Sequence, residues 1–330
     1  MSEEEVNVSG ISETVPNAKA TTALLDATEK LRGSIGQLLM GTKVGISISD
    51  SPELSQLGFS KAHQQDASVE FARFLLANGA SLHYGGDLRV GGYTELFFGL
   101  ANYYSSPQQQ DALVHSYLAW PLHLSLTTKM RADFKRRVAF HAIDPPAGLD
   151  LNLAEFLPPD TAANRYAWAR SLTNMREQME QVIHARIFIG GAETKYAGAL
   201  PGLLEEGLMA LTSNKPTYLI GAFGGATQAI IEGLTSNGSK RIATLPSRLD
   251  SLSQEVVSYY NSRHPGENEG LSFEHMQHFL ATHGLERLAE NNGLSVAENE
   301  RLFVTPHLME MINLVLTGLT RIKLKNSPEK

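Results

Sequence analysis

The stretch that decides the expected fold reads ARIFIGG over residues 185–191, LPGLLEEG over 200–207 and PTYLIGAFGG over 216–225. In the first and third of these segments, an apolar run typical of a buried strand ends in paired glycines. Glycine lets the backbone approach a ligand closely, and the N–H groups at the start of a following helix attract an anion. Two such turns within one short span predict an α/β sheet that carries a phosphate or nucleotide site.

Strands and helices are predicted to alternate along most of the chain. Apolar runs predict strands at residues 43–50, 80–84, 186–189 and 217–220, with further candidates at 114–120, 137–143 and 301–305. Apolar positions at helical spacing predict helices at residues 21–39, 62–76, 93–103, 161–183, 200–211, 226–234 and 306–319. This alternation predicts an α/β fold with a Rossmann-like, doubly wound parallel sheet and helical insertions.

The chain is expected to form a single domain over residues 43–325, preceded by a tail and a helix within residues 1–42. Two insertions are expected, near residues 105–160 and near residues 237–300, and the second is mostly polar and helical. Asn78-Gly79 is expected to end a helix, because glycine commonly adopts the left-handed conformation that terminates one.

Composition limits the functions open to this 330-residue chain. The formal net charge of -7 argues against a broad nucleic-acid interface, which needs clustered Lys and Arg. The absence of cysteine excludes disulfides, thiolate nucleophiles and Cys-based zinc sites. The 11 histidines form no pair with metal-ligand spacing, so we expect neither a metal nor a cofactor.

The first residues, Met1 to Glu5, are acidic where a secretory signal would be basic. No apolar run approaches the roughly 18 residues that a membrane-spanning helix needs. We therefore expect a cytoplasmic protein that does not contact a membrane.

The sheet predicted above also predicts where a ligand would bind. In doubly wound sheets the ligand lies beyond the carboxyl ends of the strands. That rule brings residues 47–50, 85–89, 190–195 and 221–225 to one edge, although they lie far apart in the sequence.

These residues resemble the SLOG superfamily, which is named from the Smf/DprA and lonely-guy proteins. The resemblance covers residues 43–322 and is strongest at residues 80–100 and 175–225. The chain is similar to the ligand-sensor branch, which includes domains of bacterial nucleotide-signalled conflict systems and the sensor domain that precedes melastatin-type TRP channels. The resemblance implies a Rossmann-like nucleotide-binding domain.

Lonely-guy enzymes carry Met-His-Glu-Arg-Lys on the helix before a strand that ends in Pro-Gly-Gly-x-Gly-Thr-x-x-Glu. Their Arg and final Glu carry out hydrolysis of a nucleotide N-glycosidic bond. Here residues 175–177 (Met-Arg-Glu) resemble the first element, residues 190–191 the double glycine and residues 202–205 the final Gly/Thr-x-x-Glu. The resemblance implies that Arg176 and Glu205 are catalytic if the protein is an enzyme.

The chain also departs from the enzyme pattern. No proline precedes the double glycine, residues 192–200 are inserted after it, and Pro201-Gly202 replaces Gly-Thr. These departures resemble the sensor branch, in which binding rather than cleavage is the output.

Backbone N–H groups of Gly190 and Gly191 are expected to hold phosphate, and Glu205 to accept hydrogen bonds from ribose hydroxyls. Each assignment has a structural alternative, because paired glycines also form tight turns and carboxylates are stabilised in a first helical turn anyway. The candidate ligand-binding residues are Ser47, Ser49, Asp50, Gly85, Gly86, Asp87, Arg89, Gly92, Glu95, Arg176, Gly190, Gly191, Lys195, Gly202, Glu205, Glu206, Gly224 and Gly225.

Three functional hypotheses follow from the resemblance. The first is a sensor for an ADP-ribose-like or NAD-derived nucleotide, whose output passes through a homo-oligomer or a separate effector protein. The second is a nucleotide phosphoribohydrolase of the lonely-guy type. A third, nucleic-acid binding as in the DNA-processing branch, is disfavoured by the negative net charge.

Overall fold

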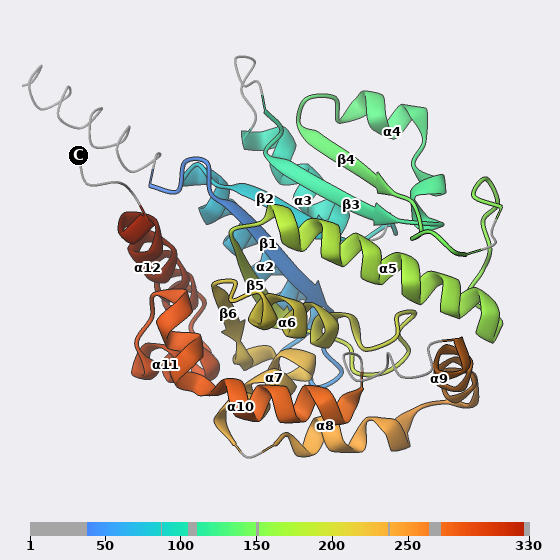
Figure 1. Cartoon of the computed structure of the whole chain (residues 1–330). Helices are drawn as coiled ribbons and strands as arrows, with labels where there is room; N and C mark the ends of the chain where they lie inside the picture. Colours follow the sequence, from blue (N-terminus) through green and yellow to red (C-terminus); the bar gives the residue numbers. More distant parts are fainter. Residues whose placement is uncertain are drawn as a thin grey trace, which may run out of the picture.

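The fold is built on one parallel sheet, seen here in a computed structural model that describes residues 38–86, 88–104, 111–149, 152–236, 238–263 and 272–326. Within these residues the sheet has the strand order β4-β3-β2-β1-β5-β6 (Figure 1). All neighbouring strands run parallel. The strands are β1 (Lys43–Ser49), β2 (Ser81–Gly85), β3 (Val114–Ala119), β4 (Val138–Ile143), β5 (Ala185–Gly190) and β6 (Thr217–Ile220).

The strand order confirms the predicted doubly wound, Rossmann-like sheet. The chain moves outward from β1 to β4, then returns to the other side of β1 to form β5 and β6. Every residue of β5 is buried, as expected for a central parallel strand that helices cover on both faces. Both candidate strands at 114–120 and 137–143 belong to this sheet, so the segment near 105–160 supplies β3 and β4.

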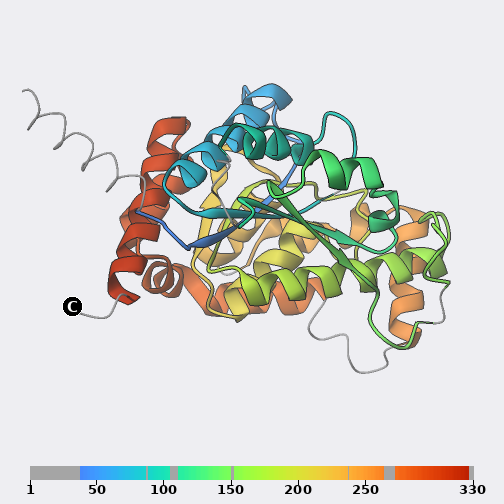
Figure 2. The ribbon, with the colours of Figure 1, turned by 90° about the horizontal axis from the view of Figure 1, so that it is seen from above.

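Helices pack on both faces of the sheet. Figure 2 shows α2 and α3, in blue and cyan, on one side and α5, in green, on the other. The first face packs against α2, α3 and α12, and the second against α5, α6, α7 and α10. The helices of the main layers are α2 (Lys61–Ala77), α3 (Tyr93–Tyr104), α5 (Ala162–Val182), α6 (Gly202–Thr212), α7 (Gly225–Thr235), α10 (Phe273–Asn292), α11 (Val296–Val304) and α12 (Leu308–Asn326).

Shorter elements connect these layers, and one longer helix lies beside α5. The short ones are η1 (Leu122–Ser125), α4 (Thr128–Asp133), η2 (Gly221–Phe223), α8 (Lys240–Thr244) and η3 (Pro246–Arg248). The longer helix, α9 (Ser251–Arg263), packs on α5. The segment 237–300 is therefore helical, as predicted, within its described residues.

The predicted strand at residues 301–305 is wrong. Residues 301–304 lie in α11, and Thr305 caps its end. A capping box between Ser295 and Glu298 starts the helix at Val296, six residues before the first of the apolar pair Leu302 and Phe303. Both apolar side chains are buried on one face of the helix, so helical packing explains the run that suggested a strand.

Left-handed glycines end two helices where the sequence placed breaks. Gly79 has a φ of +85° after Asn78, and Gly293 has a φ of +74° after α10. The predicted helix at residues 21–39 lies outside the described residues, apart from Leu38 and Leu39 in a turn before β1.

A row of histidines crosses β2, β3 and β4 on one face of the sheet. The rings of His83 and His115 stack with centroids 4.3 Å apart, and His115 Nδ1 lies 3.0 Å from His141 Nε2. His83 Nδ1 lies 3.1 Å from the Tyr117 hydroxyl. Burial, reinforced by the neighbouring imidazoles, lowers the pKa of His83 to about 2 and that of His115 to about 4. The row is therefore uncharged at neutral pH.

We expect acid to destabilise the protein through this row. Between the unfolded histidine pKa of about 6.5 and the folded His115 pKa of about 4, the unfolded chain binds protons that the folded chain does not. The free energy of unfolding should thus fall as pH is lowered, by up to about 1.4 kcal/mol per pH unit for each such histidine.

Urea unfolding of the wild type and His115→Gln between pH 7.5 and 4.5 tests this expectation. The variant should lose less stability on acidification than the wild type. The exposed His278 supplies the control, because His278→Gln should leave the pH dependence unchanged. An equal loss of stability on acidification in His115→Gln and wild type would contradict the expectation.

Candidate functional site

The carboxyl ends of β2, β1, β5 and β6 lie side by side on one edge of the sheet. The strand order reverses between β1 and β5, where Ser49 pairs with Gly190. This is the topological switch point at which α/β sheets bind ligands. The sheet therefore brings residues 47–50, 85–89, 190–195 and 221–225 to one edge, as predicted, although Asp87 lies outside the described residues.

The glycine pairs allow two turns to approach one another at this edge. Gly190, Gly191, Gly224 and Gly225 all have positive φ. The Gly191 carbonyl accepts a hydrogen bond of 3.0 Å from the Ala226 N–H, and a Cβ on Gly225 would lie only 2.3 Å from that oxygen. The N–H of Gly191 donates to the Ser49 carbonyl at 2.9 Å. Close packing of the turns thus already accounts for these glycines.

A carboxylate of the chain itself occupies the start of α7. Gly225 N–H donates to Glu53 Oε2 at 2.9 Å, and Arg241 Nη1 lies 2.6 Å from Glu53 Oε1. Burial alone would raise the pKa of Glu53, but the Gly225 hydrogen bond and Arg241 outweigh it and lower the pKa. Glu53 therefore lies where an anion is expected from the sequence.

The predicted residues Arg176 and Glu205 are in direct contact. Arg176 Nη1 lies 2.6 Å from Glu205 Oε2, and Arg176 Nε lies 3.3 Å from Glu206 Oε1. The Thr173 hydroxyl donates a hydrogen bond to Glu205. The side chains of Arg176 and Glu205 are 8% and 0% exposed, so both are almost completely shielded from solvent.

These residues belong to a larger group of charges on the α5–α6 side of the sheet. Arg186 of β5 pairs with Glu206 and with Glu180 of α5, in each case at 2.8 Å. The Ser47 hydroxyl donates to Glu206 and accepts from Arg186 at 2.9 Å. Burial raises the pKa of Glu205 despite the opposing effect of Arg176. We call Ser47, Arg176, Glu180, Arg186, Glu205 and Glu206 the buried ionic cluster.

Residues 192–201, here called the cover loop, close over Arg176 and Glu205. A Cβ on Gly198 would lie 3.2 Å from Arg176 Nη1 and 3.5 Å from Glu205 Oε2. At the start of α6, a Cβ on Gly202 would lie 2.8 Å from Arg176 Nη2. The segment inserted relative to the lonely-guy pattern is therefore the one that seals the pair.

Arginines from three elements hold the cover loop in place. Arg165 of α5 donates to the Tyr196 carbonyl. Glu193 pairs with Arg248 of η3 at 2.8 Å and with Arg241 of α8 at 3.4 Å. Sequence reasoning missed Glu53, Glu193 and Arg241, since these isolated charges carry no motif and meet only in the fold.

Most of the remaining candidates lie around the ends of β1 and β2 and the start of α3. Tyr93 donates to Asp50 at 2.9 Å, and Lys61 lies 2.9 Å from the same carboxylate. Gly91 N–H donates to Glu95 at 2.7 Å. Arg89 and Glu95 line a separate cavity of about 230 Å³ beside α4. Gly85 packs on Met175 of α5. Gly86 directly follows β2, and Gly92 directly precedes α3. Lys195 is exposed on the cover loop.

The sequence profile of one family, described as SLOG cluster2, matches residues 38–302. The chain belongs to this family. SLOG membership confirms the superfamily expected from the motifs, and it indicates a nucleotide-related function. No curated protein matches the chain.

Two further observations concern the described residues of this SLOG protein. Among its described residues, no helix is both long and apolar enough to cross a membrane. The same residues contain no group of three or more His, Asp or Glu side chains placed to hold a metal ion.

In this SLOG protein, Gly225→Ala should destabilise the fold by about 2 kcal/mol or more, because the added Cβ combines positive φ with a backbone clash. Gly99→Ala is the matched control, since Gly99 lies in α3 with open space around a Cβ. Urea unfolding measures both variants. A Gly225→Ala protein as stable as Gly99→Ala would show that the turns can move apart.

Removing Arg176 should cost about 3–5 kcal/mol, because Glu205 and Glu206 would lose a buried partner. Arg176→Met, Glu205→Gln and the double variant form a cycle measured by urea unfolding. The double variant should lose clearly less than the sum of the single losses. Additive losses would mean that the pair contributes no coupling energy to the fold.

Proposed function

We propose that the protein is a nucleotide-binding sensor that recognises an ADP-ribose-like or NAD-derived nucleotide without cleaving it. Membership of the SLOG cluster2 family supports a nucleotide as the ligand class. The choice of ADP-ribose or an NAD derivative comes from the resemblance to the ligand-sensor branch.

The observation that carries the proposal is the sealed state of Arg176 and Glu205. Glu205 is fully buried, accepts hydrogen bonds from Arg176 and Thr173, and lies under the cover loop. A hydrolase needs such a carboxylate at the glycosidic carbon of its substrate, where it stabilises an oxocarbenium-like centre. A nucleotide would have to displace the cover loop and break the ion pair to use Glu205 in this way.

Binding would act on the attachments of the cover loop. The contacts of Arg165 with Tyr196 and of Arg248 with Glu193 hold one position of that loop. A nucleotide whose affinity differs between this loop position and another would shift the population toward the position that it binds more tightly. The changed surface would then alter a homo-oligomer or the binding of a separate effector protein.

A nucleotide phosphoribohydrolase is the second candidate. Arg176 and Glu205 come from different helices and still meet at 2.6 Å at the start of α6, so the two catalytic groups of the lonely-guy pattern are adjacent. In this alternative, opening of the cover loop would expose a preassembled pair to substrate.

Thermal unfolding against ADP-ribose, NAD, cyclic ADP-ribose, AMP and cyclic dinucleotides, followed by chromatography of each mixture, separates these candidates. A bound nucleotide at 100 times its Kd should stabilise the fold by about 2.7 kcal/mol. We expect a raised melting temperature and ligand recovered intact.

Recovery of free base or ribose phosphate would instead establish the hydrolase. AMP, the substrate type of the lonely-guy pattern, is the internal control for that activity. An unchanged melting temperature with every nucleotide, and no product, would contradict both candidates.

A further inference from the structure

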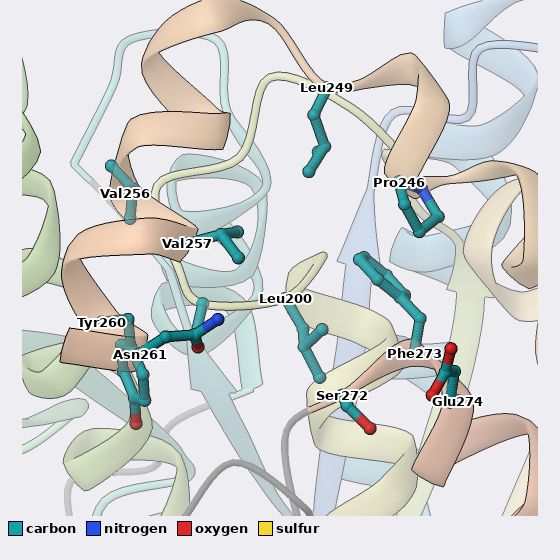
Figure 3. A pocket seen from close by; sticks show the side chains of 11 residues that line it. Leu200, Pro246, Leu249, Val256, Val257, Tyr260, Asn261, Ser272, Phe273 and Glu274 are labelled. Atoms are coloured by element: carbon teal, nitrogen blue, oxygen red, sulfur yellow. The ribbon is translucent and has the colours of Figure 1, made fainter. Parts of the chain in front are cut away.

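A cavity of about 300 Å³ lies between α9, the start of α10 and the end of the cover loop (Figure 3). Leu249, Val257 and Phe273 point into this space, with Leu200 of the cover loop at its side. Asn261 of α9 also lines the cavity. The space is therefore lined by aliphatic groups and by the aromatic residues Phe273 and Tyr260, with the polar residues Asn261, Ser272 and Glu274 beside them.

We propose that this cavity holds the base of the nucleotide, and this inference rests on the proposed function. A planar heteroaromatic ring suits the residues that line the cavity, because it can lie against Phe273 and be enclosed by Leu200, Leu249 and Val257. The Asn261 amide offers both a donor and an acceptor, which is the pair that the hydrogen-bonding edge of a nucleobase requires.

The size of the cavity sets how much of a ligand it takes. A volume of about 300 Å³ is at the lower end of the range for small-molecule pockets. It accommodates one ring system rather than a whole dinucleotide. The sugar and phosphates of the ligand would therefore lie outside the cavity.

The cavity is lined by residues of the two segments that an ion pair joins, the cover loop and residues 246–249. Leu200 belongs to the cover loop, and Pro246 and Leu249 flank Arg248, which pairs with Glu193 at 2.8 Å. A base between these two walls would contact the loop and the segment that anchors it. Occupancy of the cavity would thus change the energy of the loop position above Arg176 and Glu205.

Isothermal titration with adenosine, guanosine, cytidine and uridine tests the cavity directly, since a nucleoside carries the base without phosphates. Val257→Trp fills the space, and Val257 is partly exposed, so the larger side chain can be accommodated. Phe273→Ala removes the ring instead. Val304→Trp on α11 is the matched control, because Val304 is exposed and lies outside the cavity.

We expect at least one nucleoside to bind the wild type and Val304→Trp equally, and to bind Val257→Trp and Phe273→Ala about tenfold or more weakly. Equal binding to all four proteins would overturn the assignment of the base to this cavity, but not the proposal that the protein binds a nucleotide. Stabilisation by ADP-ribose without binding of any nucleoside would overturn that assignment as well. If no nucleoside and no nucleotide binds, both the assignment of the base to the cavity and the proposed function are overturned.

Discussion

A guanidinium in the middle of the sheet determines much of this architecture. Arg186 lies in β5 with a side chain that is 0% exposed, and a buried charge is costly unless carboxylates compensate it. Glu180 of α5 and Glu206 of α6 provide that compensation, so two helices are fixed against β5 by charge as well as by apolar packing. Glu206 in turn contacts Arg176, which places Arg176 against Glu205. The geometry at the start of α6 therefore follows from one buried strand residue.

This dependence gives Arg176 and Glu205 a structural role. Both side chains contribute to the buried ionic cluster, and the cover loop packs its Gly198 against them. The packing of the fold thus accounts for these two residues whether or not they take part in chemistry. Their motif resemblance alone therefore does not establish a catalytic role.

The sequence predicted the strands and helices of the sheet because each depends on local periodicity and on glycines at element ends. It placed Arg176 and Glu205 together through a motif resemblance. It missed Glu53, Glu193 and Arg241 because their pairing joins residues up to 188 positions apart in the chain. The prediction of a strand at residues 301–305 was wrong because a run of three apolar residues is equally compatible with a strand and with the buried face of a helix. The capping box at Ser295 starts a helix that includes this run.

The two electrostatic networks around the cover loop differ in how they meet the solvent. The side chains of Arg241 and Arg248 are 28% and 42% exposed, so mobile ions can reach their pairs with Glu53, Glu193 and Glu232. Screening weakens such pairs as ionic strength rises, whereas a pair sealed from water is screened far less. Rising ionic strength should therefore weaken the ion pairs of Glu193 with Arg241 and Arg248, which hold the cover loop, more than the buried ionic cluster beneath that loop. The stability of the loop position thus depends on the ionic strength of the solution.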